Sequence, residues 1–256
     1  MFENFDWTQF LLYLIIGFFA QIIDGSLGMA YGVSSNSFLL STGVSPAAAS
    51  ASVHIAEVFT TFVSGISHLK FNNVDKGIVK KLIIPGVVGG VVGAYLLVNF
   101  PSDIIKPIVT VYLLLMGIRI LINAFRNIPW IKFKNHHFIL LGAIGGFFDA
   151  VGGVGWGPIV TSTLLGHDDA PRKTIGSVNI SEFFVTFSEA VTFIATIGMA
   201  PWTIVLGLIS GGVIAAPLAA FLTSKVPNKL IFIIVGSVII FLQIRTILGM
   251  FGITIF

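Results

Sequence analysis

The sequence predicts an all-α polytopic membrane protein made of two inverted-topology repeats, each with about five helical segments. Three observations predict this fold class: an apolar composition, long hydrophobic runs, and a pattern of polar residues that occurs twice. Of the 256 residues, 55% are hydrophobic and only 10% are charged, whereas soluble domains carry about 25% charged residues. Charges this few cannot cover a water-facing surface, so we expect the chain to lie in the plasma membrane.

Long apolar runs supply the membrane-spanning segments, because roughly 20 apolar residues cross the hydrocarbon core as a helix. Each half contains three such runs: Pro46–Leu69, Val79–Phe100 and Ser102–Phe125 in the first, and Pro171–Gly198, Pro201–Val226 and Pro227–Leu248 in the second. A less regular segment precedes each trio, Phe10–Leu40 and Phe138–Leu165. Glycines interrupt both segments, which are long enough for a helix and a shorter piece. If the shorter pieces are re-entrant, three full crossings remain in each half.

The two halves are similar in sequence. SVHIAEVFTTF, which begins at Ser52, and SVNISEFFVTF, which begins at Ser177, are identical at seven of eleven positions. A constant offset of 125 pairs Asp24 with Asp149, Gly28 with Gly153, Gly32 with Gly157, Pro46 with Pro171 and Glu57 with Glu182. Constant spacing of this kind indicates an internal duplication. We expect a first transmembrane repeat at residues 1–126, a hydrophilic connector at 127–137 and a second repeat at 138–256.

Basic residues predict the orientation of the halves, because Lys and Arg are enriched in cytoplasmic loops. In the first half they gather between the first two apolar runs, from Lys70 to Lys81, and in the connector. In the second half they gather at the other ends of the runs, with Arg172 and Lys173 at the start of the first run, and Lys225 and Lys229 around the start of the last. Equivalent loops therefore lie on opposite sides, with the connector cytoplasmic and both termini outside. Inverted repeats are common in secondary transporters, whose substrate site lies near the membrane midplane.

Glycine clusters mark the predicted helix breaks. The stretch DGSLGMAYG, Asp24 to Gly32, corresponds to DAVGGVGWG, Asp149 to Gly157. Small residues can serve simple helix packing, but so many glycines disfavour one regular helix. Non-helical backbone at membrane depth is buried in protein or lines a cavity. We expect a half-helix to begin near Gly32 and another near Gly157, each with free N–H groups that form a natural anion site.

A polar stripe crosses the next helix in each half. His54, Glu57, Thr61 and Ser64 lie at i, i+3, i+7 and i+10, which is one helix face, and Asn179, Glu182, Thr186 and Glu189 repeat this spacing. An unpaired charge in lipid costs about 2.5–3.5 kcal/mol on insertion scales, so such residues face a cavity or a partner. The alternative is that both stripes are polar contacts that hold helices together.

The paired segments resemble the sulfite exporter TauE/SafE family over nearly the whole chain. The resemblance lies in IIDGSLGMAYGVSSNSFLLSTGVSPAAASASVHIAEVFTTFVSGISH, in FFDAVGGVGWGPIVTSTLLG, and in RKTIGSVNISEFFVTF. It implies a small transporter of two repeats that moves sulfur-containing anions such as sulfite or organosulfonates. The glycine cluster of the family is intact in GGVGWGP and thinned in the first half, where Ser26, Leu27 and Ala30 interrupt it.

Candidate site residues follow from the breaks and the stripes. For substrate binding we expect hydrogen-bond donors, and glycines that admit the substrate to the backbone: Tyr31, Ser52, His54, Trp156, Ser177, Asn179, Gly28, Gly32, Gly153 and Gly157. Carboxylates at the same depth would repel an anion, whereas burial favours the neutral form of a carboxyl group, which donates a hydrogen bond. We therefore expect Asp24, Glu57, Asp149 and Glu182 to couple export to protons while one repeat rocks against the other.

The alternative function is transport of a cation or metal ion, with the intramembrane carboxylates as ligands. His/Cys clusters at metal-ligand spacing do not accompany these carboxylates. An intramembrane enzyme is not expected, because no zinc or serine–histidine constellation recurs in both halves, and we expect no cofactor and no bound metal. The expected partners are the lipid bilayer, a small anion and protons, with a homodimer left open and nucleic acid excluded. The opening MFENFDWTQF does not resemble a removable signal peptide.

Overall fold

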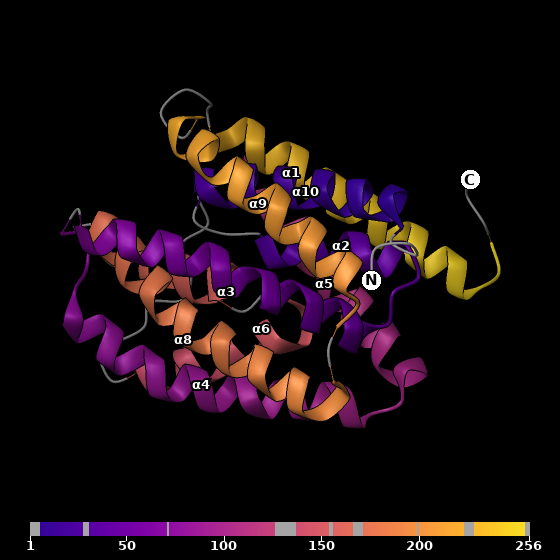
Figure 1. Cartoon of the computed structure of the whole chain (residues 1–256), viewed down its shortest axis with the longest axis horizontal. Helices are drawn as coiled ribbons and strands as arrows, with labels where there is room; N and C mark the ends of the chain where they lie inside the picture. Colours follow the sequence, from indigo (N-terminus) through magenta and orange to yellow (C-terminus); the bar gives the residue numbers. More distant parts are fainter. Residues whose placement is uncertain are drawn as a thin grey trace.

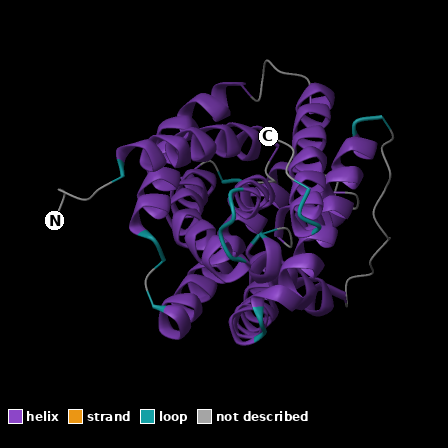
Figure 2. Ribbon diagram, turned by 90° about the vertical axis from the view of Figure 1, so that its right-hand side faces the viewer, coloured by secondary structure: helices purple, strands orange, loops and turns teal. Residues whose placement is uncertain are grey.

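The computed structural model describes residues 6–27, 31–70, 72–125, 137–153, 156–165, 171–198, 200–222 and 228–253 of the chain. Within these ranges the chain folds into helices joined by short loops, and no strand is present there (Figure 2). The prediction of an all-α protein is confirmed for this part of the chain.

The elements follow the same order in the two halves (Figure 1). They are α1 (Trp7–Leu27), α2 (Tyr31–Ser41), α3 (Pro46–Lys70), α4 (Lys76–Asn99), α5 (Ser102–Asn123), α6 (Phe138–Gly152), the π-helical segment η2 (Trp156–Thr161), α7 (Ser162–Leu165), α8 (Pro171–Ile197), α9 (Trp202–Leu222) and α10 (Asn228–Met250). By sequence offset, α1 corresponds to α6, α2 to η2 with α7, and α3, α4 and α5 to α8, α9 and α10.

Five helices in the described ranges are long and apolar enough to cross a membrane. Their qualifying segments are Trp7–Asp24, Pro46–Lys70, Lys76–Asn99, Ser102–Ile122 and Gly176–Ile197. Shorter apolar helices occupy Phe138–Gly152, Trp202–Ala216 and Gly236–Met250. The described helices thus include several with the length and apolar composition that the predicted polytopic fold needs. The connector falls, apart from His137, outside the described residues, and the inverted orientation of the halves stays a prediction.

Both helix breaks fall at the glycine clusters. In the first half α1 ends at Leu27 and α2 begins at Tyr31, and the predicted site residue Gly28 lies between them, outside the described ranges. In the second half α6 ends at Gly152, and Gly153 caps it with a φ of 67°. Glycine adopts this left-handed conformation without strain. The π-helical form of η2 is also notable, because such turns frequently occur at functional sites.

The outside of the molecule is apolar, while its interior holds polar groups. Ile84 is 71% exposed and Phe241 is 60% exposed, whereas His54 and Glu189 are each 0% exposed. In a soluble protein, acidic side chains are almost never fully buried. A lipid-facing exterior and a polar interior explain this arrangement, since intramembrane ionisable groups face the inside of a helix bundle.

Two helix pairs pack with their backbones close together, α1 against α9 and α4 against α6 (Figure 1). A Cβ atom on Gly211 of α9 would collide with the backbone of Leu14 in α1, and one on Gly89 of α4 with that of Ala143 in α6. Small residues allow membrane helices to approach in this way. Because α6 is the counterpart of α1 and α9 that of α4, the two pairs are equivalent contacts between the halves.

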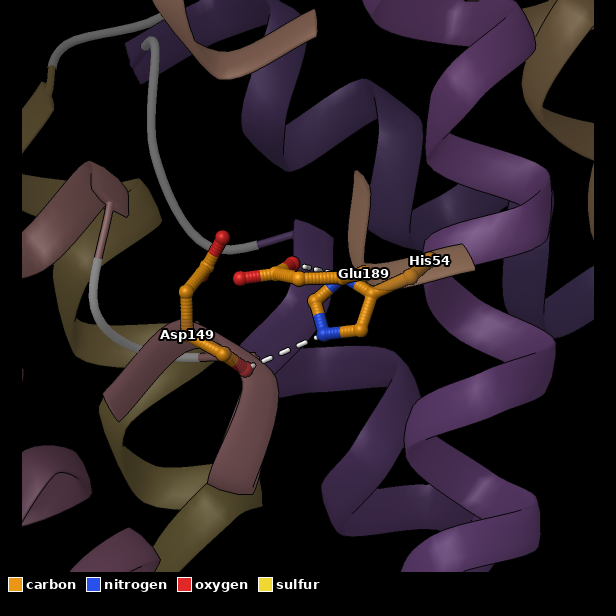
Figure 3. Close-up of side chains that lie close together, drawn as sticks. All are labelled: His54, Asp149 and Glu189. Atoms are coloured by element: carbon orange, nitrogen blue, oxygen red, sulfur yellow. Dashed lines mark hydrogen bonds and ion pairs between the residues drawn. The ribbon is translucent and has the colours of Figure 1, made fainter. Parts of the chain in front are cut away.

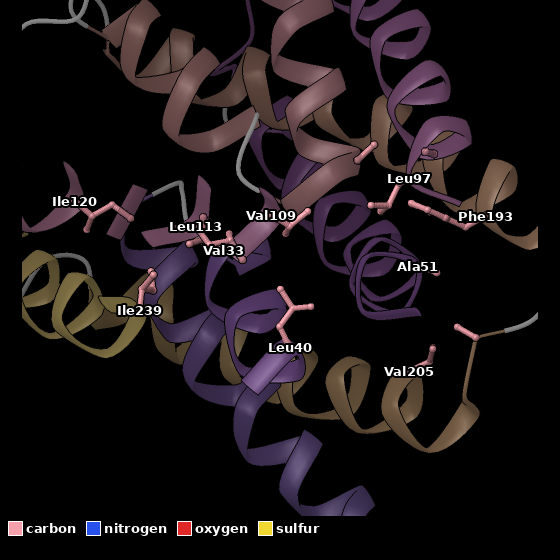
Figure 4. Close-up of a cluster of buried hydrophobic side chains, with 13 residues drawn as sticks. Val33, Leu40, Ala51, Leu97, Val109, Leu113, Ile120, Phe193, Val205 and Ile239 are labelled. Atoms are coloured by element: carbon pink, nitrogen blue, oxygen red, sulfur yellow. The ribbon is translucent and has the colours of Figure 1, made fainter. Parts of the chain in front are cut away.

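The short helix α2 lies in the interior of the bundle. Its Val33 and Leu40 belong to the main apolar cluster, together with Leu113 of α5 and Phe193 of α8 (Figure 4). A half-helix has unsatisfied backbone groups at its ends, and these are tolerated at membrane depth where protein surrounds them. Helix α2 therefore begins among the helices of the bundle, where it contacts α3, and α3 in turn contacts α8.

Candidate functional site

The two helix breaks meet at Gly32 and Gly153. A Cβ atom on Gly32, in the first turn of α2, would collide with the backbone carbonyl of Gly153 at the end of α6. A Cβ atom on Gly153 would lie 2.5 Å from the side-chain nitrogen of Asn36 and 2.8 Å from Cα of Gly32. Both positions therefore need glycine for this close approach. Two segments 121 positions apart in the sequence thus form one junction between the halves.

An aspartate holds the start of the half-helix in the second half. Asp149 Oδ1 accepts a hydrogen bond from the backbone N–H of Trp156, at 3.2 Å. Asp24 and Tyr31 are the equivalent residues in the first half, at the same spacing of seven positions. The N–H groups at these positions were expected to face a bound anion. In the second half the N–H group is instead bonded to a carboxyl group of the protein, so Asp149 stabilises that break.

The aromatic donors are also bonded within the protein. The indole nitrogen Nε1 of Trp156 donates to the carbonyl of Val178 in α8, at 3.1 Å. The hydroxyl of Tyr31 donates to the carbonyl of Leu208 in α9, at 3.3 Å. Both rings are buried. The predicted site residues Tyr31 and Trp156 thus lie at the junction, where each connects a half-helix to a neighbouring long helix.

His54 stands at the centre of a buried polar cluster (Figure 3). Its Nδ1 lies 3.1 Å from Glu57 Oε2 and 3.2 Å from Glu189 Oε2. Its Nε2 lies 3.1 Å from the backbone oxygen of Asp149. The ring stacks on Phe193, with the centroids 6.0 Å apart. His54 therefore connects α3 in the first half to α6 and α8 in the second.

The contacts of His54 determine its tautomer. A backbone carbonyl can only accept a hydrogen bond, so Nε2 carries the proton that is donated to Asp149. Nδ1 then faces the carboxyl groups of Glu57 and Glu189. At least one proton must lie between Nδ1 and these oxygens, because otherwise only acceptors would meet there. Glu57, Asp149 and Glu182 also act on Glu189 through their charges, so the cluster is strongly acidic.

A second contact between α3 and α8 is equivalent to the first. Ser64 Oγ donates to Asn179 Oδ1, at 2.8 Å. By the offset of 125, His54 is equivalent to Asn179 and Ser64 is equivalent to Glu189. The contact of His54 with Glu189 and the contact of Ser64 with Asn179 therefore join the same two positions, with the halves exchanged. The polar stripes predicted from the sequence therefore face each other, and the predicted site residue Asn179 lies opposite the first stripe.

The remaining predicted residues differ in what they contact. Ser52 Oγ donates to the carbonyl of Ala48 in its own helix, at 2.7 Å. Ser177 Oγ accepts from the backbone N–H of Asp75, at 2.7 Å, and so fixes the loop before α4. Glu182 is half-buried, and Gly157 is buried in η2 beside Trp156.

Two residues of the region were absent from the predicted set. Glu189 is fully buried against His54, and a Cβ atom on Gly90 of α4 would collide with its carboxyl group. Its place in the second stripe was a usable signal. Asn36 reaches the glycine junction from α2, and only its spacing of one helical turn from Gly32 could have indicated this.

The same cluster has the composition of a cation site. His54, Asp149 and Glu189 each offer one possible ligand atom, and these three atoms lie within 4.8 Å of one another. One nitrogen and two carboxylate oxygens are ligands that divalent transition metals accept. This arrangement is the structural basis for the alternative of cation transport.

Known proteins resemble the chain over most of its length. The family model described as "Sulfite exporter TauE/SafE" matches residues 13–246. A protein of Bacillus subtilis (strain 168), described as "Probable membrane transporter protein YtnM", is 45% identical over 250 residues, which cover 94% of this chain and 83% of that relative. No solved structure matches.

Proposed function

Because the chain belongs to the sulfite exporter TauE/SafE family and is a multi-pass membrane protein, we propose that it is a secondary transporter of small sulfur-containing anions. Sulfite, a sulfonate or an organosulfonate is the substrate, and export is the direction of transport. A negative cell interior favours outward movement of a monoanion by about 2.3 kcal/mol per 100 mV.

The observation that carries this proposal is the junction of Gly32 and Gly153. Each glycine lies at the break of a helix in a different half, and the two backbones are in contact. Transporters with inverted repeats bind substrate near the midplane, where discontinuous helices meet. Rocking of one half against the other would open this junction to one side of the membrane at a time.

Protons are the proposed coupling ion. Glu57 and Asp149 both lie beside His54, and Glu182 and Asp24 are their equivalents by sequence offset, which supports a common role for the four carboxyl groups. When protonated, these groups donate hydrogen bonds and tolerate a neighbouring anion; when ionised, they repel it. Uptake of a proton would thus favour anion binding, and its loss would favour release.

Transport of a divalent cation is the second candidate, supported by the cluster of His54, Asp149 and Glu189. Proteoliposomes containing the purified protein separate the two. We expect uptake of labelled sulfite that methanesulfonate inhibits, and no uptake of Mn²⁺. Uptake of Mn²⁺ without uptake of sulfite would establish the second candidate instead.

A substitution tests the coupling. Glu182→Gln keeps a hydrogen-bond donor for the anion but removes the exchangeable proton. We expect the variant to bind sulfite and to lose the pH dependence of transport between about pH 5 and pH 8. Asp103→Asn, in the first turn of α5, is the control for loss of an exposed carboxylate. An unchanged pH profile in Glu182→Gln would exclude Glu182 as the proton carrier.

A further inference from the structure

Most side chains predicted to donate hydrogen bonds to the substrate are already hydrogen-bonded to other groups of the protein. The indole N–H of Trp156 and the hydroxyl of Tyr31 donate to carbonyls of α8 and α9. Ser52 donates to its own helix, and Ser177 bonds the loop before α4. An anion held at the glycine junction therefore needs other donors, which should be buried at the junction and not already bonded.

Helix α2 supplies such donors. Several buried hydroxyls in the long helices, such as those of Ser181 and Thr246, donate to the carbonyl four residues earlier, although that of Thr186 in α8 does not. The hydroxyl of Ser35 and the side-chain nitrogen of Asn36 have no hydrogen-bond partner, although these residues are only 0% and 2% exposed. Buried polar groups are hydrogen-bonded in the large majority of cases, so these exceptions call for a ligand or a water.

The two donors lie on the face of α2 that meets the second break. Gly32, Ser35 and Asn36 occupy positions i, i+3 and i+4, which are neighbours on one side of a helix. Gly32 contacts the backbone of Gly153, and the side-chain nitrogen of Asn36 lies directly over Gly153. Ser35 and Asn36 thus flank the junction between the halves. Ser37 is equally buried and its hydroxyl is also unpartnered, but its position is on the other side of the helix.

We infer that Ser35 and Asn36 form an oxyanion-binding site at the Gly32–Gly153 junction, an inference that rests on the proposed function. The amide nitrogen of Asn36 only donates, and the hydroxyl of Ser35 can donate as well, so together they match acceptor oxygens such as those of sulfite or a sulfonate. Both groups are neutral and stay donors at any pH. They therefore hold the anion, while the neighbouring acidic residues respond to protons.

Binding measurements on the purified full-length protein in detergent test this site, with sulfite and methanesulfonate as probes in titration calorimetry. Each of Ser35→Ala and Asn36→Asp should weaken binding by about tenfold or more, because each removes a donor and the second adds a repelling carboxylate. Ser37→Ala is the matched control in the same half-helix and should bind as the wild type does. Asn36→Ser, which keeps a donor, should retain part of the affinity and serves if Asn36→Asp does not fold.

The outcomes separate this inference from the proposed function. If the wild type binds sulfite and neither Ser35→Ala nor Asn36→Asp weakens it, the site is wrong and the function stands. If the wild type binds neither probe but binds phosphate or acetate in a manner that needs Ser35, the site stands and the proposed substrate is wrong. Equal losses in Ser35→Ala and Ser37→Ala overturn the site.

Discussion

The two equivalent contacts between α3 and α8 differ in chemistry. In one, His54 meets Glu189 and both groups are ionisable; in the other, Asn179 meets Ser64 and neither group titrates. The offset of 125 supplies the same pair of positions twice, and only one of the two contacts is made of ionisable side chains. Equivalent positions in the two halves can therefore hold groups of different chemistry, one ionisable and the other neutral.

The comparison presupposes that the halves are inverted, and labelling tests this with an all-or-none result. The chain has no cysteine, so single cysteines can be introduced without background. In intact cells an impermeant thiol reagent should label Gly198→Cys, in the loop before α9, and should leave Asn135→Cys in the connector unlabelled until the cells are opened. Labelling of Asn135→Cys alone would contradict the inverted arrangement and with it the equivalence of the two contacts.

The next largest effect is expected at the junction. Gly153→Leu places a side chain on a residue with positive φ that already contacts Gly32 and Asn36, so sulfite transport in proteoliposomes should be lost. Membrane insertion, measured as protein yield in the membrane fraction, should persist.

Gly249→Leu is the control for this variant, because nothing lies within 4 Å of a Cβ atom there. Equal loss of transport in both variants would indicate that the glycines serve general packing and not the site.

The smallest expected effects are on the free energy of unfolding, which should differ between variants of the two contacts that join α3 and α8. Glu189→Ala removes one of the two carboxyl groups beside His54 Nδ1 and leaves a space where a fully buried side chain was packed, and truncation of a large buried side chain to alanine costs about 2–5 kcal/mol. Ser64→Ala removes one neutral hydrogen bond to Asn179, which is expected to cost about 1 kcal/mol. Thermal unfolding of the purified variants in detergent should therefore show a much larger decrease in apparent Tm for Glu189→Ala. Equal decreases would mean that the contact of His54 with Glu189 contributes no more than the neutral pair.

Periodicity and composition predicted the helices and their breaks because both are local properties. The glycine clusters interrupted the apolar pattern at Gly28 and Gly153, and the structure ends α1 and α6 at these clusters. The stripes were found by their spacing along α3 and α8. Their mutual contact could be expected only from the assumed symmetry of the halves.

The bonding state of each donor could not be predicted from the sequence. Ser177 and Ser35 are both buried serines in helices, yet one fixes the loop at Asp75 and the other has no partner. This difference depends on which segments pack against each helix, a property of the tertiary structure. Glu189 was left out of the predicted set for a related reason, because its equivalent in the first half is Ser64 and symmetry alone did not indicate an acidic partner for His54.

The contact of Gly32 with Gly153 has a consequence for the electrical tightness of the membrane. The two backbones are so close that a methyl group does not fit between them, and a water molecule is of similar size. The closed junction therefore leaves no room for a water molecule directly between Gly32 and Gly153. In the proposed transport cycle, this closed contact would limit the leak of protons and small ions, so that many copies of the protein would not dissipate the membrane voltage.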